Sequence, residues 1–148
     1  MKLPNAALEF ATKKHEGQFY LPEMPYVEHC KRVALQFESE HCQIVALLHD
    51  VLEDTDCTAG EIGDAFGWSV RNRVQILTRQ KREKYSAYLT RVIRDTIACE
   101  IKRADIFDNL SNCIINLERY PEDERDWLLM AKRYARAAQF LIENADAP

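Results

Sequence analysis

Apolar residues recur along this chain at the spacing of helix faces, and few residues interrupt them. Four glycines and five prolines occur in 148 residues, and the alternating apolar and polar pattern of strands is scarce. Hydrophobic residues make up 47% of the chain and charged residues 30%, a balance typical of globular proteins. The sequence therefore predicts an all-α helical bundle, with residues 1–148 forming a single domain around one core.

The expected helices begin at prolines or capping residues and end at loops or glycines. Thr58 and Glu61 form a capping-box pattern, and Gly67 separates two of the helices. A loop is predicted over 17–24. Helices are expected to start near Asn5 and at Pro25, and others to cover about 41–52, 85–96, 98–117 and the segment from Pro121 onward. A short helix is expected after Thr58, and a further helix after Gly67 carries Val70, Val74 and Leu77.

Charge and cysteine content narrow the function classes. The net charge of −4 disfavours binding to nucleic acid, since proteins that coat a phosphate backbone are usually basic. No apolar run approaches the roughly 20 residues that span a bilayer, so no membrane segment is expected. The five cysteines include no CxxC pair, and residues 1–5 lack the apolar core of a signal peptide. These features predict reduced thiols in the cytoplasm, and no pattern specifies an oligomeric state.

Ionisable residues that could take part in catalysis or metal binding are concentrated in residues 46–55. His49 and Asp50 close an apolar run there, and Glu53 and Asp54 follow within one helical turn. Ionisable groups beside a buried stretch are costly unless they are paired or bind a ligand. If the helix continues, Glu53 lies next to His49 and Asp54 next to Asp50, where a carboxylate could take a proton from water. The alternative is an acidic helix end, which would oppose the helix dipole.

Two more polar sites lie on other expected helices. His29 stands on an otherwise apolar face, where a buried core histidine is the commoner explanation. Asp105 begins a polar stripe that continues through Asp108 or Asn109 to Asn112. A solvent-facing side would explain this stripe, but apolar residues continue it toward the N-terminus, which favours burial.

Two imidazoles and two carboxylates would make a mixed nitrogen and oxygen ligand set. Such a set suits Mn²⁺, Fe²⁺, Co²⁺ or Zn²⁺ better than Ca²⁺, and the absence of thiolates disfavours a structural zinc site. Four protein ligands leave room for water or substrate on an octahedral ion, and such an ion makes its bound water more acidic.

Five segments between His15 and about Asn112 form a set of motifs whose order and spacing are highly specific. They are His15-Glu16-Gly17-Gln18, Pro25-Tyr26-Val27-Glu28-His29, 47–55, Phe66-Gly67-Trp68-Ser69-Val70 and 102–109. Together they resemble the HD-domain phosphohydrolases, specifically the Rel/Spo-type guanosine tetraphosphate (ppGpp) hydrolases and the single-domain small alarmone hydrolases.

The resemblance implies an HD-type helical bundle that removes pyrophosphate from the ribose 3′ position, as in the stringent response. It implies that Glu53 and Asp54 activate or position the attacking water, and that Asn109 lies near the nucleoside. Tyr20 and Asn112 are further candidates for substrate contact. The implied ligands of the metal, usually Mn²⁺, are His29, His49, Asp50 and Asp105.

The chain departs from the family on the side that recognises the base. The family usually has a basic pair where this chain has Tyr20 and Leu21, and a small Ser-Gly in the loop that here reads Pro22-Glu23-Met24. An arginine common after Asn109 is replaced by Ser111. Tyr20 could stack on a base but supplies no charge.

Three hypotheses follow. The first is a hydrolase of guanosine alarmones or a related 3′-phosphorylated nucleotide, such as an adenosine alarmone. The second is an HD-type hydrolase of nucleoside monophosphates, and the third is a binding or antitoxin-like regulatory module. Six basic residues and one acid between residues 71 and 84 are typical of a solvated helix face, with a funnel for polyphosphate as the alternative.

Overall fold

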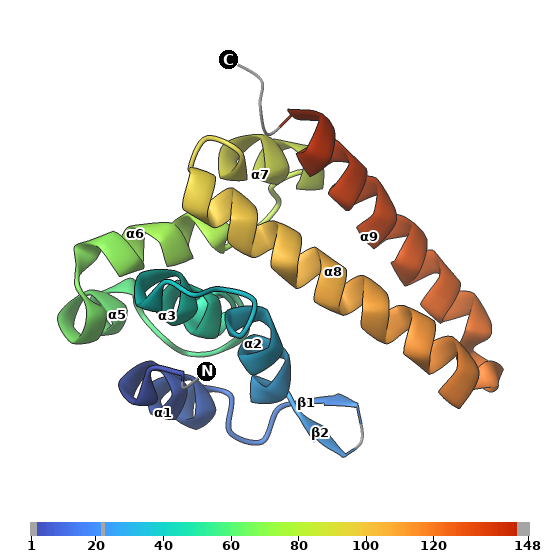
Figure 1. Ribbon diagram of the computed structural model, residues 1–148, viewed down its shortest axis with the longest axis horizontal. Coiled ribbons are helices and arrows are strands. Elements are labelled where there is room, and N and C mark those ends of the chain that lie inside the picture. The colour runs from blue at the N-terminus through green and yellow to red at the C-terminus, as the bar shows by residue number, and fades with distance from the viewer. Residues whose placement is uncertain (1–2, 22, 145–148) are drawn as a thin grey trace.

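The computed structural model describes residues 3–21 and 23–144, and it confirms the predicted all-α class (Figure 1). The one sheet in the described residues is an antiparallel pair of short strands. The elements, in chain order, are α1 (Asn5–Lys14), β1 (Phe19–Leu21), β2 (Met24–Pro25), α2 (Val27–Ala34), α3 (Glu40–Leu48), α4 (Val51–Asp54), α5 (Ala59–Phe66), α6 (Trp68–Leu77), α7 (Tyr85–Val92), α8 (Thr96–Arg119), the 3-10 turn η1 (Pro121–Asp123) and α9 (Glu124–Asn144).

Helix α8 lies at the centre of the arrangement. It packs against α2, α3, α6 and α7, and along much of its length against α9, which runs back beside it (Figure 1). Its apolar residues Ile101 and Ile106 are fully buried, as are Leu47 and Leu48 of α3 and Leu141 of α9. Burying side chains of this kind is the main source of stability for such a bundle.

The helix predicted over about 41–52 is interrupted. Helix α3 ends at Leu48, and α4 covers only Val51–Asp54. Asp50 lies between them with φ −104° and ψ −5°, and its carbonyl accepts the Asp54 N–H. The prediction of one continuous helix was therefore wrong, and the interruption turns His49 and Asp50 toward the interior.

The segment predicted as a loop over 17–24 contains the two strands instead. Phe19 pairs with Pro25, and Leu21 pairs with Met24. Pro25 therefore belongs to β2, and α2 begins two residues later at Val27. Residues 1–2, Pro22 and residues 145–148 lie outside the described residues. The expectation that the loop at Pro22 differs from the family's small Ser-Gly loop therefore stays a prediction.

Capping residues set several other boundaries. The Thr58 capping box is present: its hydroxyl accepts the Glu61 N–H, and the Glu61 carboxylate accepts the Thr58 N–H. Gly67 separates α5 from α6 as predicted, with φ +83°, a conformation that favours glycine. The boundary between α7 and α8 differs from prediction, because the Asp95 side chain caps α8 and places Thr96 in α8.

Helix α9 begins after the 3-10 turn that Pro121 opens, slightly later than predicted. On its face toward the bundle, Ala138 and Leu141 are buried, while Trp127, Ala131 and Tyr134 are half-buried. Within 3–21 and 23–144, none of the helices combines the length and the apolar character needed to cross a bilayer.

Candidate metal centre and active site

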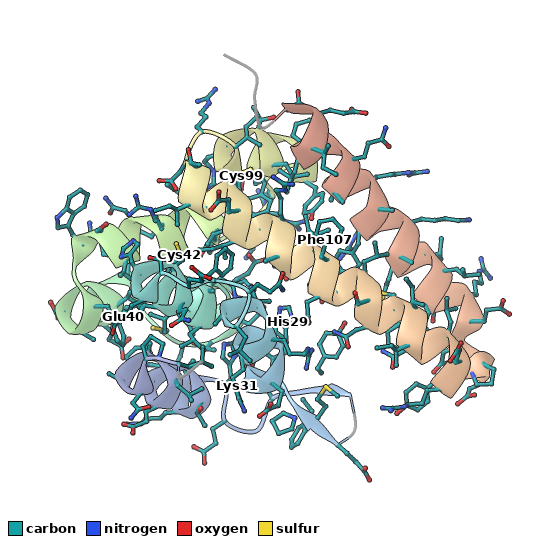
Figure 2. All side chains as sticks on the ribbon, in the orientation of Figure 1. His29, Lys31, Glu40, Cys42, Cys99 and Phe107 are labelled. Atoms are coloured by element: carbon teal, nitrogen blue, oxygen red, sulfur yellow. The ribbon has the colours of Figure 1, made fainter. Side chains whose placement is uncertain are left out.

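Three separate parts of the fold bring the predicted metal ligands together. His29 comes from α2, His49 and Asp50 from the interruption between α3 and α4, and Asp105 from α8. One ligand atom each from His29, His49 and Asp105 lies within 4.8 Å of the others, and all three residues are buried. The labelled His29 lies between α2 and α8 in Figure 2.

The carboxylates face the Nε2 atoms of both histidines. Asp105 Oδ1 lies 3.1 Å from His29 Nε2 and 3.6 Å from His49 Nε2. Asp50 Oδ2 lies 3.0 Å from His49 Nε2 and 3.8 Å from His29 Nε2. None of these contacts has the geometry of a hydrogen bond, so both buried Nε2 atoms lack a hydrogen-bond partner among the described residues.

In each of the two histidines, the hydrogen-bond partner of Nδ1 determines which ring nitrogen carries the proton. His49 Nδ1 lies 2.7 Å from the Ala46 carbonyl oxygen, which can only accept, so Nδ1 carries a proton. His29 Nδ1 lies 2.7 Å from Asp108 Oδ2 and donates in the same way. In the neutral rings, each Nε2 therefore presents a lone pair beside a carboxylate oxygen. The lone pair and the carboxylate oxygen repel each other, and a cation bound between them would remove this repulsion. The residues therefore fit a divalent metal ion.

The electrostatics of the group favour positive charge between the acids. Burial disfavours protonation of His49, but Asp50 and Asp105 outweigh it and raise the pKa of His49 well above its usual value. Burial raises the pKa of Asp105, and Lys102 and the two histidines outweigh this and hold it well below its usual range. Protons compete with metals for such ligands, so a bound ion would displace them.

Neighbouring side chains hold the two acids in place. The Tyr26 hydroxyl donates to Asp50 Oδ2 at 2.6 Å. The Lys102 ammonium donates to Asp105 Oδ2 at 2.6 Å, and the Asn109 amide donates to Asp105 Oδ1 at 2.6 Å. Each acid is therefore oriented by at least one partner outside the predicted ligand set.

The predicted catalytic pair lies beside this group. The loss of water around the Asp54 carboxyl, followed by the charges of Asp50 and Glu53, raises the pKa of Asp54 to about 6. A carboxylate with a pKa in this range is suited to proton transfer near neutral pH. The Glu53 carboxylate instead accepts the backbone N–H of Arg79 at 2.8 Å, which connects α4 to the loop after α6. The Gln18 amide donates to the Asp54 carbonyl oxygen at 2.7 Å.

A cavity of about 310 Å³ opens onto these residues. Its wall includes the acids Asp50, Glu53, Asp54 and Asp105. Three cationic side chains also line it, from the loop after α6, from α8 and from α9: Arg79, Lys102 and Arg133. A cavity that combines a candidate metal centre with cations is suited to a phosphorylated small molecule.

The three residues predicted to contact substrate differ in whether they line the cavity. Tyr20 lines the cavity, and its ring stacks near that of His29, with centroids 6.1 Å apart and an angle of 18° between the planes. Its hydroxyl donates to Asn109 Oδ1 at 3.3 Å, and Asn109 also lines the cavity. Asn112 lies one turn farther along α8 than Asn109, and its amide donates to Asp108. A substrate contact for Asn112 stays a prediction.

Comparison with known proteins identifies the family. No protein-family model matches the chain. Guanosine-3′,5′-bis(diphosphate) 3′-pyrophosphohydrolase MESH1 of Drosophila melanogaster is 30% identical over 141 residues, which cover 85% of this chain and 79% of that protein. The chain belongs to this pyrophosphohydrolase family. An enzyme of Aquifex aeolicus with the name guanosine-3′,5′-bis(diphosphate) 3′-pyrophosphohydrolase is 34% identical over 116 residues, or 70% of this chain.

The relatives differ in size from this member of the family. The chain spans 17% of the length of the Aquifex aeolicus enzyme and 17% of its Haemophilus influenzae counterpart. A solved structure of a metazoan ortholog of SpoT that hydrolyzes ppGpp superposes over 100% of both chains, with a TM-score of 0.67 and 24% sequence identity. This likeness confirms the predicted HD-type helical fold.

Several site residues of this family member were missed from the sequence. Tyr26 and Lys102 fall inside the motifs that carry the resemblance, and the three-residue spacing of Lys102 and Asp105 on a helix could have indicated their contact. Arg133 comes from α9, and no local pattern connects it to residues far away in the chain. Arg79 was considered only as part of the basic run, of which it is the member that lines this cavity among the described residues.

Proposed function

We propose that the chain is a metal-dependent phosphohydrolase that removes the 3′-pyrophosphate from guanosine alarmones, ppGpp or pppGpp. The observation that carries the proposal is the pair of buried, unpartnered Nε2 atoms of His29 and His49 facing Asp50 and Asp105. Membership in the pyrophosphohydrolase family supports the same reaction, and the three cationic side chains in the cavity wall support a phosphorylated substrate.

In this proposal His29, His49, Asp50 and Asp105 hold the ion, with Mn²⁺ the leading candidate and other divalent transition metals as alternatives. When bound, the ion would supply Lewis-acid stabilisation of charge that develops on the phosphoryl oxygens. Tyr26 and Lys102 keep the two carboxylates oriented, since each donates to an oxygen of Asp50 or Asp105.

Asp54 is proposed to take the proton of the attacking water, because its raised pKa suits proton transfer near neutral pH. The water oxygen bonds to the phosphorus attached to O3′, the bond from that phosphorus to O3′ breaks, and the proton passes through Asp54 to O3′. The products are pyrophosphate and the nucleoside with its 5′ phosphates intact, GDP from ppGpp and GTP from pppGpp. Glu53 orients the water in this proposal, while its contact with the Arg79 N–H holds the cavity rim.

Substrate recognition is proposed to divide between two walls of the cavity. Arg79 and Arg133 supply charge for the phosphates. Tyr20 stacks on the base and Asn109 supplies an amide group near the nucleoside, while Asn112, whose amide nitrogen donates to Asp108, would offer only its amide oxygen. Because Tyr20 carries no charge where the family usually has a cation, adenosine alarmones and other 3′-pyrophosphorylated nucleotides are the second candidate substrates.

We further propose that residues 1–148 act as one hydrolase domain in the cytoplasm, on a free nucleotide and not on nucleic acid. The buried core draws residues from α1 to α9, which supports a single folding unit. The cysteines are buried, and Cys30, Cys42, Cys57 and Cys113 carry free thiols, which supports a reducing compartment.

The deciding experiment incubates the purified chain with Mn²⁺ and a panel of nucleotides, and separates the products by anion-exchange chromatography. The expected result is conversion of ppGpp to GDP with release of pyrophosphate. Asp54→Asn should remove this activity, whereas Asp64→Asn, which neutralises an exposed acid on α5, should leave it unchanged. Release of orthophosphate from nucleoside monophosphates alone would contradict the proposal, as would no reaction of metal-loaded protein with any 3′-pyrophosphorylated nucleotide.

A further inference from the structure

A second acid on α8, Asp108, contacts the proposed metal ligand His29 at the ring edge opposite Nε2. Asp108 lies three residues after Asp105, and its Oδ2 is 2.7 Å from Nδ1 of His29. The opposite edge of the same ring faces Asp105, with Nε2 3.1 Å from Oδ1. The His29 imidazole is fully buried between these two carboxylates, so its orientation is set on both sides.

Asp108 is itself held firmly. The Arg32 guanidinium donates from Nε to Oδ1 at 2.8 Å and from Nη2 to Oδ2 at 2.9 Å, a two-pronged pairing. The Asn112 amide donates to Oδ2 at 2.9 Å. With three donated hydrogen bonds besides that of His29, the carboxylate keeps its position and its negative charge.

The two histidines therefore differ in their outer partners. His49 Nδ1 donates to the neutral carbonyl of Ala46, and His29 Nδ1 donates to a charged carboxylate. A carboxylate acceptor fixes the tautomer and orientation of a metal-binding imidazole and makes its other nitrogen a stronger electron donor. His29 should thus be the stronger donor of the pair.

We propose that Asp108, fixed by Arg32 and Asn112, is a positioning residue that holds His29 with Nε2 toward the metal and increases its affinity for the ion. The inference rests on the metal site of the proposed function. The competing explanation is an ion pair that merely joins α2 to α8. In that case, loss of Asp108 would change stability and leave metal affinity unchanged.

The test measures Zn²⁺ affinity of the full chain by competition with a chromophoric chelator, with no substrate present. Asp108→Ala should weaken binding about 10- to 100-fold. Asp108→Asn should weaken it less, because the amide oxygen still accepts from Nδ1 without the charge. Arg32→Met should also weaken binding, because Asp108 loses its two-pronged anchor. Glu100→Gln, which neutralises an exposed acid of the same helix, is the matched control and should bind as the wild type does.

A spectroscopic readout separates positioning from structure. In the diamagnetic Zn²⁺-loaded protein, nitrogen-15 NMR should show His29 protonated at Nδ1 with slow exchange, and this protection should disappear in Asp108→Ala. Wild-type affinity in a folded Asp108→Ala protein would overturn the proposal. If Asp108→Ala does not fold, unchanged affinity in Asp108→Asn would overturn it, and a several-fold loss would support it. Absence of Zn²⁺ binding in the wild type would instead remove the proposed metal site itself.

Discussion

At the residue scale, the site consists of groups that would be costly to bury separately. His29, His49 and Asp105 are each less than 5% exposed, and each would destabilise the fold if left without a charged partner. Together, two imidazoles and two carboxylates balance one another, and each is oriented by a neighbour such as Tyr26 or Lys102. The same pairing that makes burial tolerable also prepares the group for a cation.

Asp50 and Asp54 should separate metal binding from chemistry. Asp50→Ala removes a proposed ligand, so both bound metal per chain and activity should be lost. Asp54→Ala removes the proposed proton acceptor, so activity should fall about 10²- to 10⁴-fold while metal stays bound. Elemental analysis of desalted protein and a pyrophosphate assay make the two measurements. Equal metal loss in both variants would contradict this division of roles.

Tyr20 should affect substrate affinity more than turnover. Its ring stacks near His29 at the cavity wall, and base stacking on an aromatic side chain contributes about 1–3 kcal/mol. Tyr20→Ala should therefore raise KM for ppGpp about 5- to 150-fold with a smaller change in kcat. Tyr20→Phe keeps the ring and loses only the 3.3 Å hydrogen bond to Asn109, so its KM should stay close to that of the wild type. Equal KM values for the wild type and Tyr20→Ala would contradict the stacking role.

At the element scale, short interruptions and caps position the functional groups. The break between α3 and α4 places His49 and Asp50 side by side at the site, and Asp54 follows at the end of α4. Downstream, α5 starts at the Thr58 capping box, and Glu61 of that box also accepts from Lys14 of α1 at 2.8 Å. One carboxylate therefore stabilises a helix start and joins two elements.

Glu61 gives a pH dependence of stability. The hydrogen bond from Lys14, followed by those from Thr58, lowers the pKa of Glu61 from 4.5 to about 2. Because the folded pKa is below the unfolded value, its contribution is complete above about pH 4.5 and disappears as pH falls toward 2. Urea unfolding between pH 5 and 2.5 should show a smaller stability loss in Glu61→Gln than in the wild type. Glu9→Gln, an exposed change on α1, is the control, and identical slopes for Glu61→Gln and the wild type would contradict the assignment.

At the scale of the whole molecule, the proposed metal site joins α2, the interruption between α3 and α4, and α8. These segments are far apart in the chain, and α8 contacts most of the other helices. A cation bound only by the folded state would therefore stabilise the entire bundle and not one element.

Metal loading should raise the melting temperature. At a free metal concentration of 100 times Kd, linkage predicts about 2.7 kcal/mol of added stability, which corresponds to about 5–10 °C for a chain of this size. Differential scanning calorimetry with Mn²⁺ and then with excess chelator measures the rise and its reversal. Asp50→Ala should show no rise. A comparable rise in that variant would indicate that the ion binds elsewhere.

The sequence predicted the helical class and many helix starts, because capping residues and helical spacing are local properties. Asn5, the Thr58 capping box and Gly67 were located this way. The strands around Pro22 and the break after Leu48 were not, because both depend on contacts with distant segments. Gln18, for example, connects the strand region to Asp54 of α4.

The sequence by itself determined which residue types are available for chemistry: His29, His49, Asp50 and Asp105 lie in the motifs that carry the family resemblance, and they are the proposed metal ligands. Only the tertiary structure decided what surrounds them. Asp108 and Arg32 behind His29, and Arg133 across the cavity, come from helices whose relative placement depends on how α2, α8 and α9 pack. Local spacing fixes the face of a helix on which a side chain lies, but packing of whole helices decides which side chains from other elements it meets.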